Sequence, residues 1–236
     1  MAVKIVRVAD LGTVRLQKRR GTSNLRISVD QKGIIRVGMP TWLPFQSGID
    51  FARSHTDWIE KQRSRQPVVS LLKNGDRIGK NHTLRITYAG DDIKTRITAT
   101  DVIVTLPDID IANSDVQAKI LAACERALKK EAQILLPQRL AALARQNNYI
   151  YNSLHIKKLK TRWGSCSSQQ DITLNYFLMQ LPWELIDYVL LHELNHTEHM
   201  HHQRDFWYAL ENVLPDCKTR RKALKEYQPT VIRTTL

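Results

Sequence analysis

The feature that most constrains this chain is a pair of histidines four residues apart, in the segment H-E-L-N-H at residues 192–196. Residues i and i+4 lie about 40° apart around a helix and one turn apart along it, so both imidazoles can reach one ion. The segment continues a helical stripe made by Leu185, Val189, His192 and His196. Glu193 lies at a different azimuth, where its carboxylate can face a water molecule bound to the ion. The pattern therefore predicts a metal-binding helix with an acid–base group beside it.

The third metal ligand is left open by the spacing. A catalytic zinc site takes three protein ligands and keeps one position free, and the candidates are His199, His201 and His202. On an unbroken helix His199 would lie almost two turns beyond His192, past His196. His202 can bind the same ion only if the helix ends near Met200 and the chain turns back. The alternative to a metal site is a buried helix with two hydrogen-bonded core histidines.

The first 110 residues are rich in strand patterns. Apolar and polar residues alternate over 13–17, 25–29, 33–37, 83–88, 95–98 and 102–106, which is typical of half-buried strands. One helix is expected near residues 45–65. The acidic segment 107–113 has no regular pattern, so we expect it to separate a β-rich N-terminal domain, residues 1–110, from a second domain, residues 111–236.

The second domain is predicted to be mainly helical, which makes the chain α+β. A long helix begins at Ser114-Asp115, and Pro137 should kink it or divide it. Two extended segments, 154–163 and 172–179, are expected to pair as a hairpin across the polar turn 164–168. Pro182 then opens the helix that carries the two histidines.

Charge and cysteine content limit the partners and the cellular compartment that we expect. The chain has 36 Lys and Arg against 23 Asp and Glu, a net charge of +13, which favours anionic partners such as nucleotides or nucleic acid. Basic clusters at 157–162 and 218–225 flank the H-E-x-x-H segment. Three widely spaced cysteines do not indicate a disulfide framework. With no signal-peptide core and no apolar run of bilayer length, we expect a soluble cytoplasmic protein without a membrane partner.

Several segments together resemble the YgjP-like metallopeptidase family. They are R-W-G-S-C at 162–166, I-T-L-N at 172–175, D-Y-V-L-L at 187–191 running into the H-E-x-x-H, and His202 followed by Phe206-Trp207. This family is a compact branch of the zincin metalloproteases, related to the SprT-like proteins. The resemblance implies a mainly helical zincin-like domain with a short β-sheet and one zinc ion per chain. It implies His192, His196 and His202 as zinc ligands and Glu193 as the general base.

The expected function is that of a zinc-dependent hydrolase, with a metallopeptidase favoured. Glu193 would assist the attack of a zinc-bound water on a peptide carbonyl, and by resemblance the polypeptide substrate would lie along the strand at 172–177. Arg162, Tyr176 and His199 are candidates for stabilising the oxyanion.

Three alternatives to this function remain. A nucleoside-triphosphate pyrophosphatase would keep zinc and Glu193 and hold phosphates with the basic clusters. A DNA-associated SprT-like protease would use the basic surface as a tether. A non-catalytic zinc module is disfavoured, because a structural site needs no base.

Overall fold

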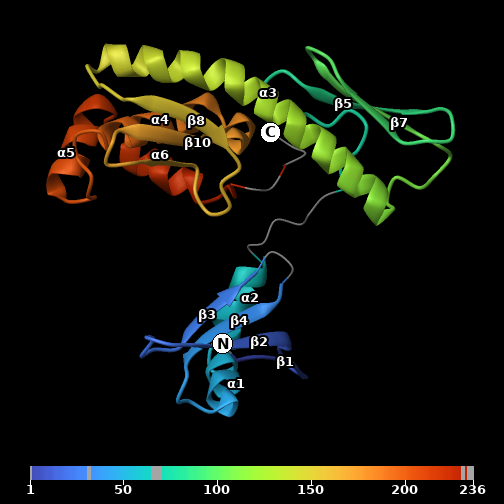
Figure 1. Ribbon diagram of the computed structural model, residues 1–236, viewed down its shortest axis with the longest axis vertical. Coiled ribbons are helices and arrows are strands. Elements are labelled where there is room, and N and C mark those ends of the chain that lie inside the picture. Colours follow the sequence, from blue (N-terminus) through green and yellow to red (C-terminus); the bar gives the residue numbers. More distant parts are fainter. Residues whose placement is uncertain (1, 31–32, 65–70, 230–231, 233–236) are drawn as a thin grey trace. The chain divides into compact units, whose positions relative to one another are not determined.

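The computed structural model describes residues 2–30, 33–64, 71–229 and 232. Contacts divide the chain into two compact units, residues 1–68 and 69–236, which we call the first and second units. The chain is α+β, with strands prominent toward the N-terminus and helices toward the C-terminus, as the sequence predicts (Figure 1). Among the described residues, no helix combines the length and the apolar character that crossing a bilayer requires.

The first unit is a mixed sheet with two helices packed against it. Its elements are β1 (Val3–Val8), β2 (Gly12–Arg19), β3 (Arg26–Val29), β4 (Ile35–Pro40), α1 (Phe45–Arg53) and α2 (Thr56–Ser64). The strand order is β1-β2-β4-β3, with β2 and β4 parallel and the other neighbours antiparallel. Alternate residues such as Val14, Leu16 and Val37 are buried with Ala52 and Ile59 of the helices. This burial explains why the alternating pattern forms a one-sided sheet.

The single helix predicted near residues 45–65 is two helices in the structure. The first ends at Arg53, where the backbone N–H of Ser54 caps it by donating to Asp50 and Ala52. The hydroxyl of Thr56 donates to the Arg53 carbonyl and begins the second helix. Residue 65 lies outside the described residues. The strand β1 was not predicted, because its charged residues mask the alternation.

The second unit contains two three-stranded sheets and the remaining helices. The first sheet has the order β5-β7-β6, from β5 (Thr83–Tyr88), β6 (Lys94–Ile97) and β7 (Asp101–Leu106). The second has the order β8-β10-β9, from β8 (Ser153–Lys157), β9 (Gly164–Cys166) and β10 (Asp171–Asn175). The helices are α3 (Ser114–Gln146), the 3-10 helix η1 (Tyr176–Gln180), α4 (Trp183–Asn195), α5 (Arg204–Val213) and α6 (Cys217–Leu224).

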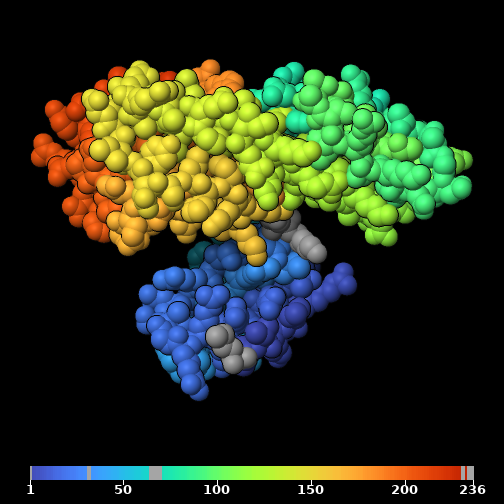
Figure 2. All heavy atoms as spheres, turned by 45° about the horizontal axis from the view of Figure 1, so that its top comes forward, coloured from blue at the N-terminus to red at the C-terminus, as the bar shows by residue number. Residues whose placement is uncertain are grey.

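Helix α3 is the layer that both sheets share. It contacts β6 and β7 of one sheet, and β8 of the other sheet together with η1 and α4. The two sheets lie along different parts of its length (Figure 1), and Figure 2 shows its outer face running along this unit. The helix begins at Ser114, as predicted, and the side chain of Asn113 caps it by accepting a hydrogen bond from the N–H of Asp115. Pro137 lies inside the helix and does not divide it.

The predicted boundary at residue 110 differs from the division seen in the contacts. Residues 69–110 belong with the second unit, because the buried side of the β5–β7 sheet, including Val102 and Val104, joins one apolar core with α3. Buried Glu131 of α3 also accepts hydrogen bonds from the backbone N–H groups of Lys80, Asn81 and His82. That carboxylate fixes the loop before β5 to the helix.

The predicted hairpin between 154–163 and 172–179 is wrong in its pairing. β10 is the central strand, parallel to β8 on one side and antiparallel to β9 on the other. The antiparallel partner, Gly164–Cys166, lies in the segment that was predicted to be the turn. A strand of three residues is too short to show an alternating pattern.

Candidate active site

Helix α4 brings the H-E-x-x-H segment to the surface of an apolar core. It begins directly after Pro182, and Leu185, Ile186 and Leu190 are buried against the rest of the second unit. The histidine end of the stripe leaves this core, with His192 half-buried and His196 only 8% exposed. The helix is therefore anchored in the core along its length, and its last turns hold the two histidines at the edge of that core.

The chain turns back directly after the second histidine. α4 ends at Asn195, and the hydroxyl of Thr197 donates to the Leu194 carbonyl at 2.8 Å. The buried Asn195 side chain donates to the Phe206 carbonyl at 2.9 Å and accepts from the Tyr149 hydroxyl at 3.1 Å. These bonds tie the end of α4 to the start of α5, and the intervening segment carries His202. For His202 to reach the same ion, the helix had to end near Met200. It ends at Asn195, five residues before Met200.

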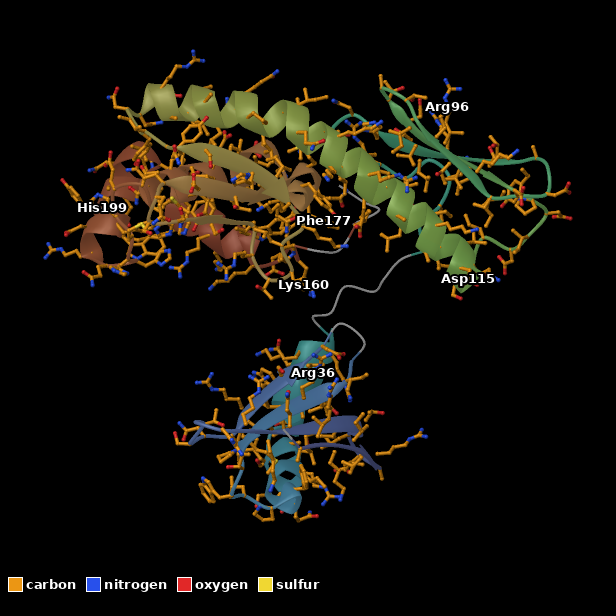
Figure 3. All side chains as sticks on the ribbon, in the orientation of Figure 1. Arg36, Arg96, Asp115, Lys160, Phe177 and His199 are labelled. Atoms are coloured by element: carbon orange, nitrogen blue, oxygen red, sulfur yellow. The ribbon has the colours of Figure 1, made fainter. Side chains whose placement is uncertain are left out.

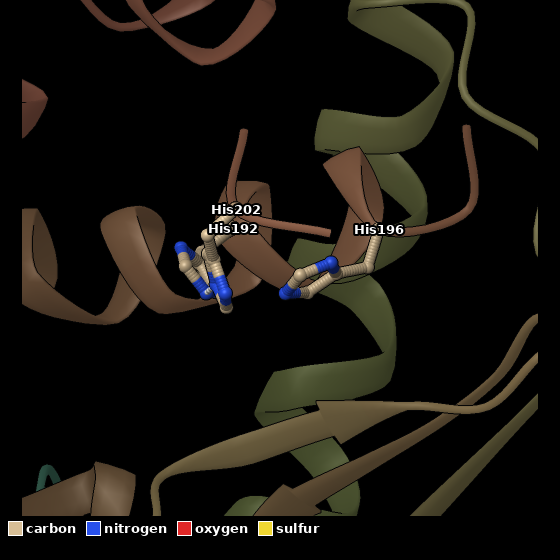
Figure 4. A group of neighbouring side chains, drawn as sticks. All are labelled: His192, His196 and His202. Carbon is tan, nitrogen blue, oxygen red and sulfur yellow. Dashed lines mark hydrogen bonds between the residues drawn. The ribbon is translucent and has the colours of Figure 1, made fainter. Parts of the chain in front are cut away.

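Three imidazoles converge at this turn (Figure 4). One ring nitrogen from each of His192, His196 and His202 lies within 4.8 Å of the others, and the Nε2 atoms of His192 and His202 are 3.0 Å apart. An ion about 2.0–2.1 Å from each nitrogen in a tetrahedral site requires nitrogens about 3.3 Å apart. The ring of Phe206 lies within 5 Å of all three, at centroid distances of 4.9, 4.6 and 4.7 Å. The cluster therefore has the dimensions of a metal site, and the Phe206 ring packs against all three imidazoles.

The donor chemistry of the cluster suits a cation. The Nδ1 of His196 lies 3.0 Å from the His199 carbonyl, which can only accept, so this bond leaves Nε2 with a free lone pair. The buried Nδ1 of His192 has no hydrogen-bond partner among the described residues. Burial, followed by the charges of His196 and His202, lowers the pKa of His192 to about 3. Burial also lowers the pKa of His196 and of His202. Neutral imidazoles are the form that binds metal, so the residues present fit a divalent ion.

Glu193 is buried and is not one of the three clustered side chains. Its side chain lies against Gly164 of β9, so closely that a Cβ on that glycine would stand 2.7 Å from Glu193 Cγ and Oε1. Burial raises the pKa of Glu193 to about 8, and the charge of Arg162 opposes this. Gly164 therefore makes the space in which this carboxylate lies.

Two hollows adjoin the histidines and Glu193. One, of about 340 Å³, lies beside all three histidines and is lined by β9 and Met200. The other, of about 420 Å³, extends from His192 and Glu193 along α6 and contains Arg162, Arg221 and Lys225. The Arg221 guanidinium lies over the Trp207 ring, 4.6 Å from its centroid. The site is thus open on both sides of Glu193, and one side is strongly basic.

The other residues singled out from the sequence lie apart from the histidine cluster. The side chains of His199 and His201 are not members of it, and Figure 3 shows His199 on the turn after α4. Tyr176 faces α3, where its hydroxyl donates to Glu125 at 3.0 Å, so it is not placed to stabilise an oxyanion. Burial raises the pKa of the Cys166 thiol to about 11, so this thiol of β9 is not activated as a nucleophile.

Four residues that support the site were missed by sequence reasoning. They are Gly164, Asn195, Tyr149 and Phe206. Gly164 and Asn195 lie inside motifs that were noticed, so their presence there was a usable signal. Tyr149 donates a hydrogen bond to Asn195, which lies 46 residues further along the chain. No local sequence pattern indicates a contact over that separation.

The fold and the site define a chain with three convergent histidines suited to a divalent metal. The chain belongs to the YgjP-like family: the model of the YgjP-like metallopeptidase domain matches residues 23–227. A metallopeptidase zymogen, abylysin of Pyrococcus abyssi, is 25% identical over 42% of this chain and 100% of its own, with a TM-score of 0.36. The metallopeptidase zymogen jannalysin of Methanocaldococcus jannaschii is 22% identical over 38% of this chain and 93% of its own, with a TM-score of 0.35. No curated protein matches the chain.

Proposed function

We propose that the protein is a zinc-dependent peptidase in which His192, His196 and His202 hold one zinc ion and Glu193 is the general base. The observation that carries the proposal is the joint geometry of the end of α4 and the segment that follows it. Three imidazole nitrogens converge within 4.8 Å, and the buried carboxylate of Glu193 lines the same hollow as the three histidines. A structural metal site would not require that carboxylate.

The roles of the side chains follow from their surroundings. Zinc, when bound, acidifies water and polarises a carbonyl oxygen. Glu193 accepts the proton from the attacking water and returns it to the leaving amine. Its raised pKa, about 8, lies near neutrality, where one group can both take and give a proton. Phe206, which is fully buried, packs against the histidine rings from the side of the core.

The free edge of β9 is the strand along which we place an extended substrate. The sequence analysis expected the substrate along the strand at 172–177. In the structure this strand is β10, which is paired on both sides and has no free edge. β9 pairs only with β10 among the described strands, and its Gly164 contacts Glu193. An extended peptide added to this edge would be held by backbone hydrogen bonds beside the proposed base.

The proposal is tested by comparing wild type, Glu193→Gln and chelator-treated protein on an unfolded protein and a peptide library. Glu193→Gln keeps the shape of the side chain and removes the proton acceptor. It should retain zinc, as measured by metal analysis, and lose at least about 100-fold in hydrolysis. Chelation should abolish hydrolysis, and zinc should restore it. Retained hydrolysis in the zinc-loaded variant would refute the role of Glu193.

A second candidate is hydrolysis of a nucleoside-triphosphate phosphoanhydride. It is favoured by the basic hollow, where Arg162, Arg221 and Lys225 lie beside Glu193. A guanidinium group can donate two parallel hydrogen bonds to the oxygens of one phosphate. A nucleoside-triphosphate panel run beside the peptide library separates the two. Zinc-dependent pyrophosphate release without peptide cleavage would replace the peptidase proposal.

A further inference from the structure

The first unit has one sheet face that is buried and one that is basic. Val14, Leu16 and Val37 point to the helices, so the residues between them in β2 and β4 point the other way. On this second face Arg15 of β2 lies directly opposite Arg36 of β4. Arginine side chains on neighbouring strands repel one another, so the sequence maintains this arrangement against a local electrostatic cost.

These arginines surround a hollow of about 440 Å³. Its floor includes Gly38, which pairs with Gln17 on one side and Arg26 on the other and contributes no side chain. The residues lining it are Arg15, Gln17, Arg19, Thr22, Asn24, Arg26, Ile27, Ser28, Arg36, Val37 and Gly38. Four guanidinium groups are therefore combined with hydroxyl and amide donors and with no acidic or aromatic side chain.

Most of the acidic residues of this unit lie away from the basic sheet face. Residues 1–68 hold thirteen Lys and Arg against five Asp and Glu, so they carry +8 of the total of +13. Three of the acidic residues, Asp50, Asp57 and Glu60, lie on α1 and α2. Asp10 follows β1 and faces Arg53 of α1 at 3.6 Å.

One acidic residue reaches the arginines of the sheet. Asp30 pairs with Arg36 at 2.8 Å. Arg15 and Arg26 are exposed and have no carboxylate partner among the described residues. Their charges are therefore directed to solvent, where an external anion can reach them.

We propose that this basic face, defined by Arg15, Arg19, Arg26 and Arg36, binds the phosphodiester backbone of nucleic acid. Guanidinium groups present paired donors to phosphate oxygens, and the exposed side chains of Ser28 and Asn24 supply further donors to phosphate and sugar. No aromatic side chain lines the hollow, so no base stacks there. The binding is independent of sequence and falls steeply with salt. It does not depend on the histidine cluster or on the proposed peptidase activity.

The test measures binding of labelled single-stranded RNA, single-stranded DNA and duplex DNA to the full chain by fluorescence anisotropy, over about 50–200 mM salt. Wild type should bind at least one of them with micromolar affinity at the low-salt end. Arg15→Glu/Arg26→Glu should bind at least tenfold more weakly. If both arginines contact phosphates, the slope of log K against log salt should fall by about two.

The matched control is Lys129→Glu/Lys130→Glu, two exposed positions on α3 with the same change of net charge. It should bind nearly as wild type. Circular dichroism verifies the fold, and Arg15→Gln/Arg26→Gln repeats the test if the double glutamate variant does not fold. Equal losses in the two charge-reversed variants would overturn the proposal, because net charge would then explain the binding. Tighter binding to poly-glutamate or to phosphatidylserine vesicles than to nucleic acid would also overturn it.

Discussion

Gly164 lies so close to Glu193 that one added methyl group should displace the proposed base. The Cβ of Gly164→Ala would stand 2.7 Å from Glu193 Cγ and Oε1 and 2.9 Å from Cδ, whereas unstrained carbon contacts begin at about 3.5 Å. The carboxylate or β9 must therefore move by about 1 Å. A misplacement of that size can reduce turnover by about 100-fold, and the overpacking costs about 1–3 kcal/mol of unfolding free energy.

The assay for Gly164→Ala measures metal content, thermal stability and hydrolysis on one preparation. Zinc stoichiometry should be unchanged, because the change lies on the Glu193 side of the helix. Gly38→Ala is the matched control, since it also lies in a strand and its added Cβ would meet nothing closer than 4.0 Å. Full hydrolysis by Gly164→Ala, together with loss in Glu193→Gln, would show that the carboxylate tolerates displacement and would refute the geometric reasoning.

Four further variants test the ligands of the site, its support at Asn195 and the buried carboxylate of Glu131. His202→Ala should weaken zinc affinity by more than the 10–100-fold typical of losing an outer hydrogen-bond partner, while His201→Ala should leave a zinc titration unchanged. Asn195→Ala removes two buried hydrogen bonds, so it should cost about 1–3 kcal/mol in denaturant unfolding. It should also weaken zinc binding, because the segment carrying His202 loosens. Glu131→Ala leaves three backbone N–H groups without their acceptor. It should cost at least about 1–3 kcal/mol with unchanged zinc stoichiometry, and equal stability to wild type would contradict this assignment.

Local features of this protein were predictable from sequence, and features that depend on distant contacts were not. The α4 helix and the stripe ending in His192 and His196 follow from spacing alone. The position of His202 depends on Asn195 contacting Tyr149 and the Phe206 carbonyl, and spacing left it as one of three candidates. The family resemblance, and not periodicity, selected it.

Strand pairing and unit boundaries show the same limit. The alternation in β5–β7 identified strands, but it does not show which helix the sheet packs against. That depends on the apolar surface of the partner, which here is α3. The boundary was therefore placed at residue 110, where the composition changes. Similarly, β9 is recognisable only through its pairing with β10, which is why its edge beside Glu193 was not anticipated.

Because α3 supplies the opposing apolar layer to both sheets of the second unit, neither sheet can complete its folding as an autonomous module. A fragment beginning at residue 111 would remove the strands that cover Val116, Ile120 and Cys124, all of which are fully buried in the intact chain. These apolar side chains would then form an exposed patch on an otherwise charged protein, so such a fragment should self-associate. The histidine cluster, although encoded within eleven residues, thus depends on a cooperative folding unit that begins about forty residues before α3.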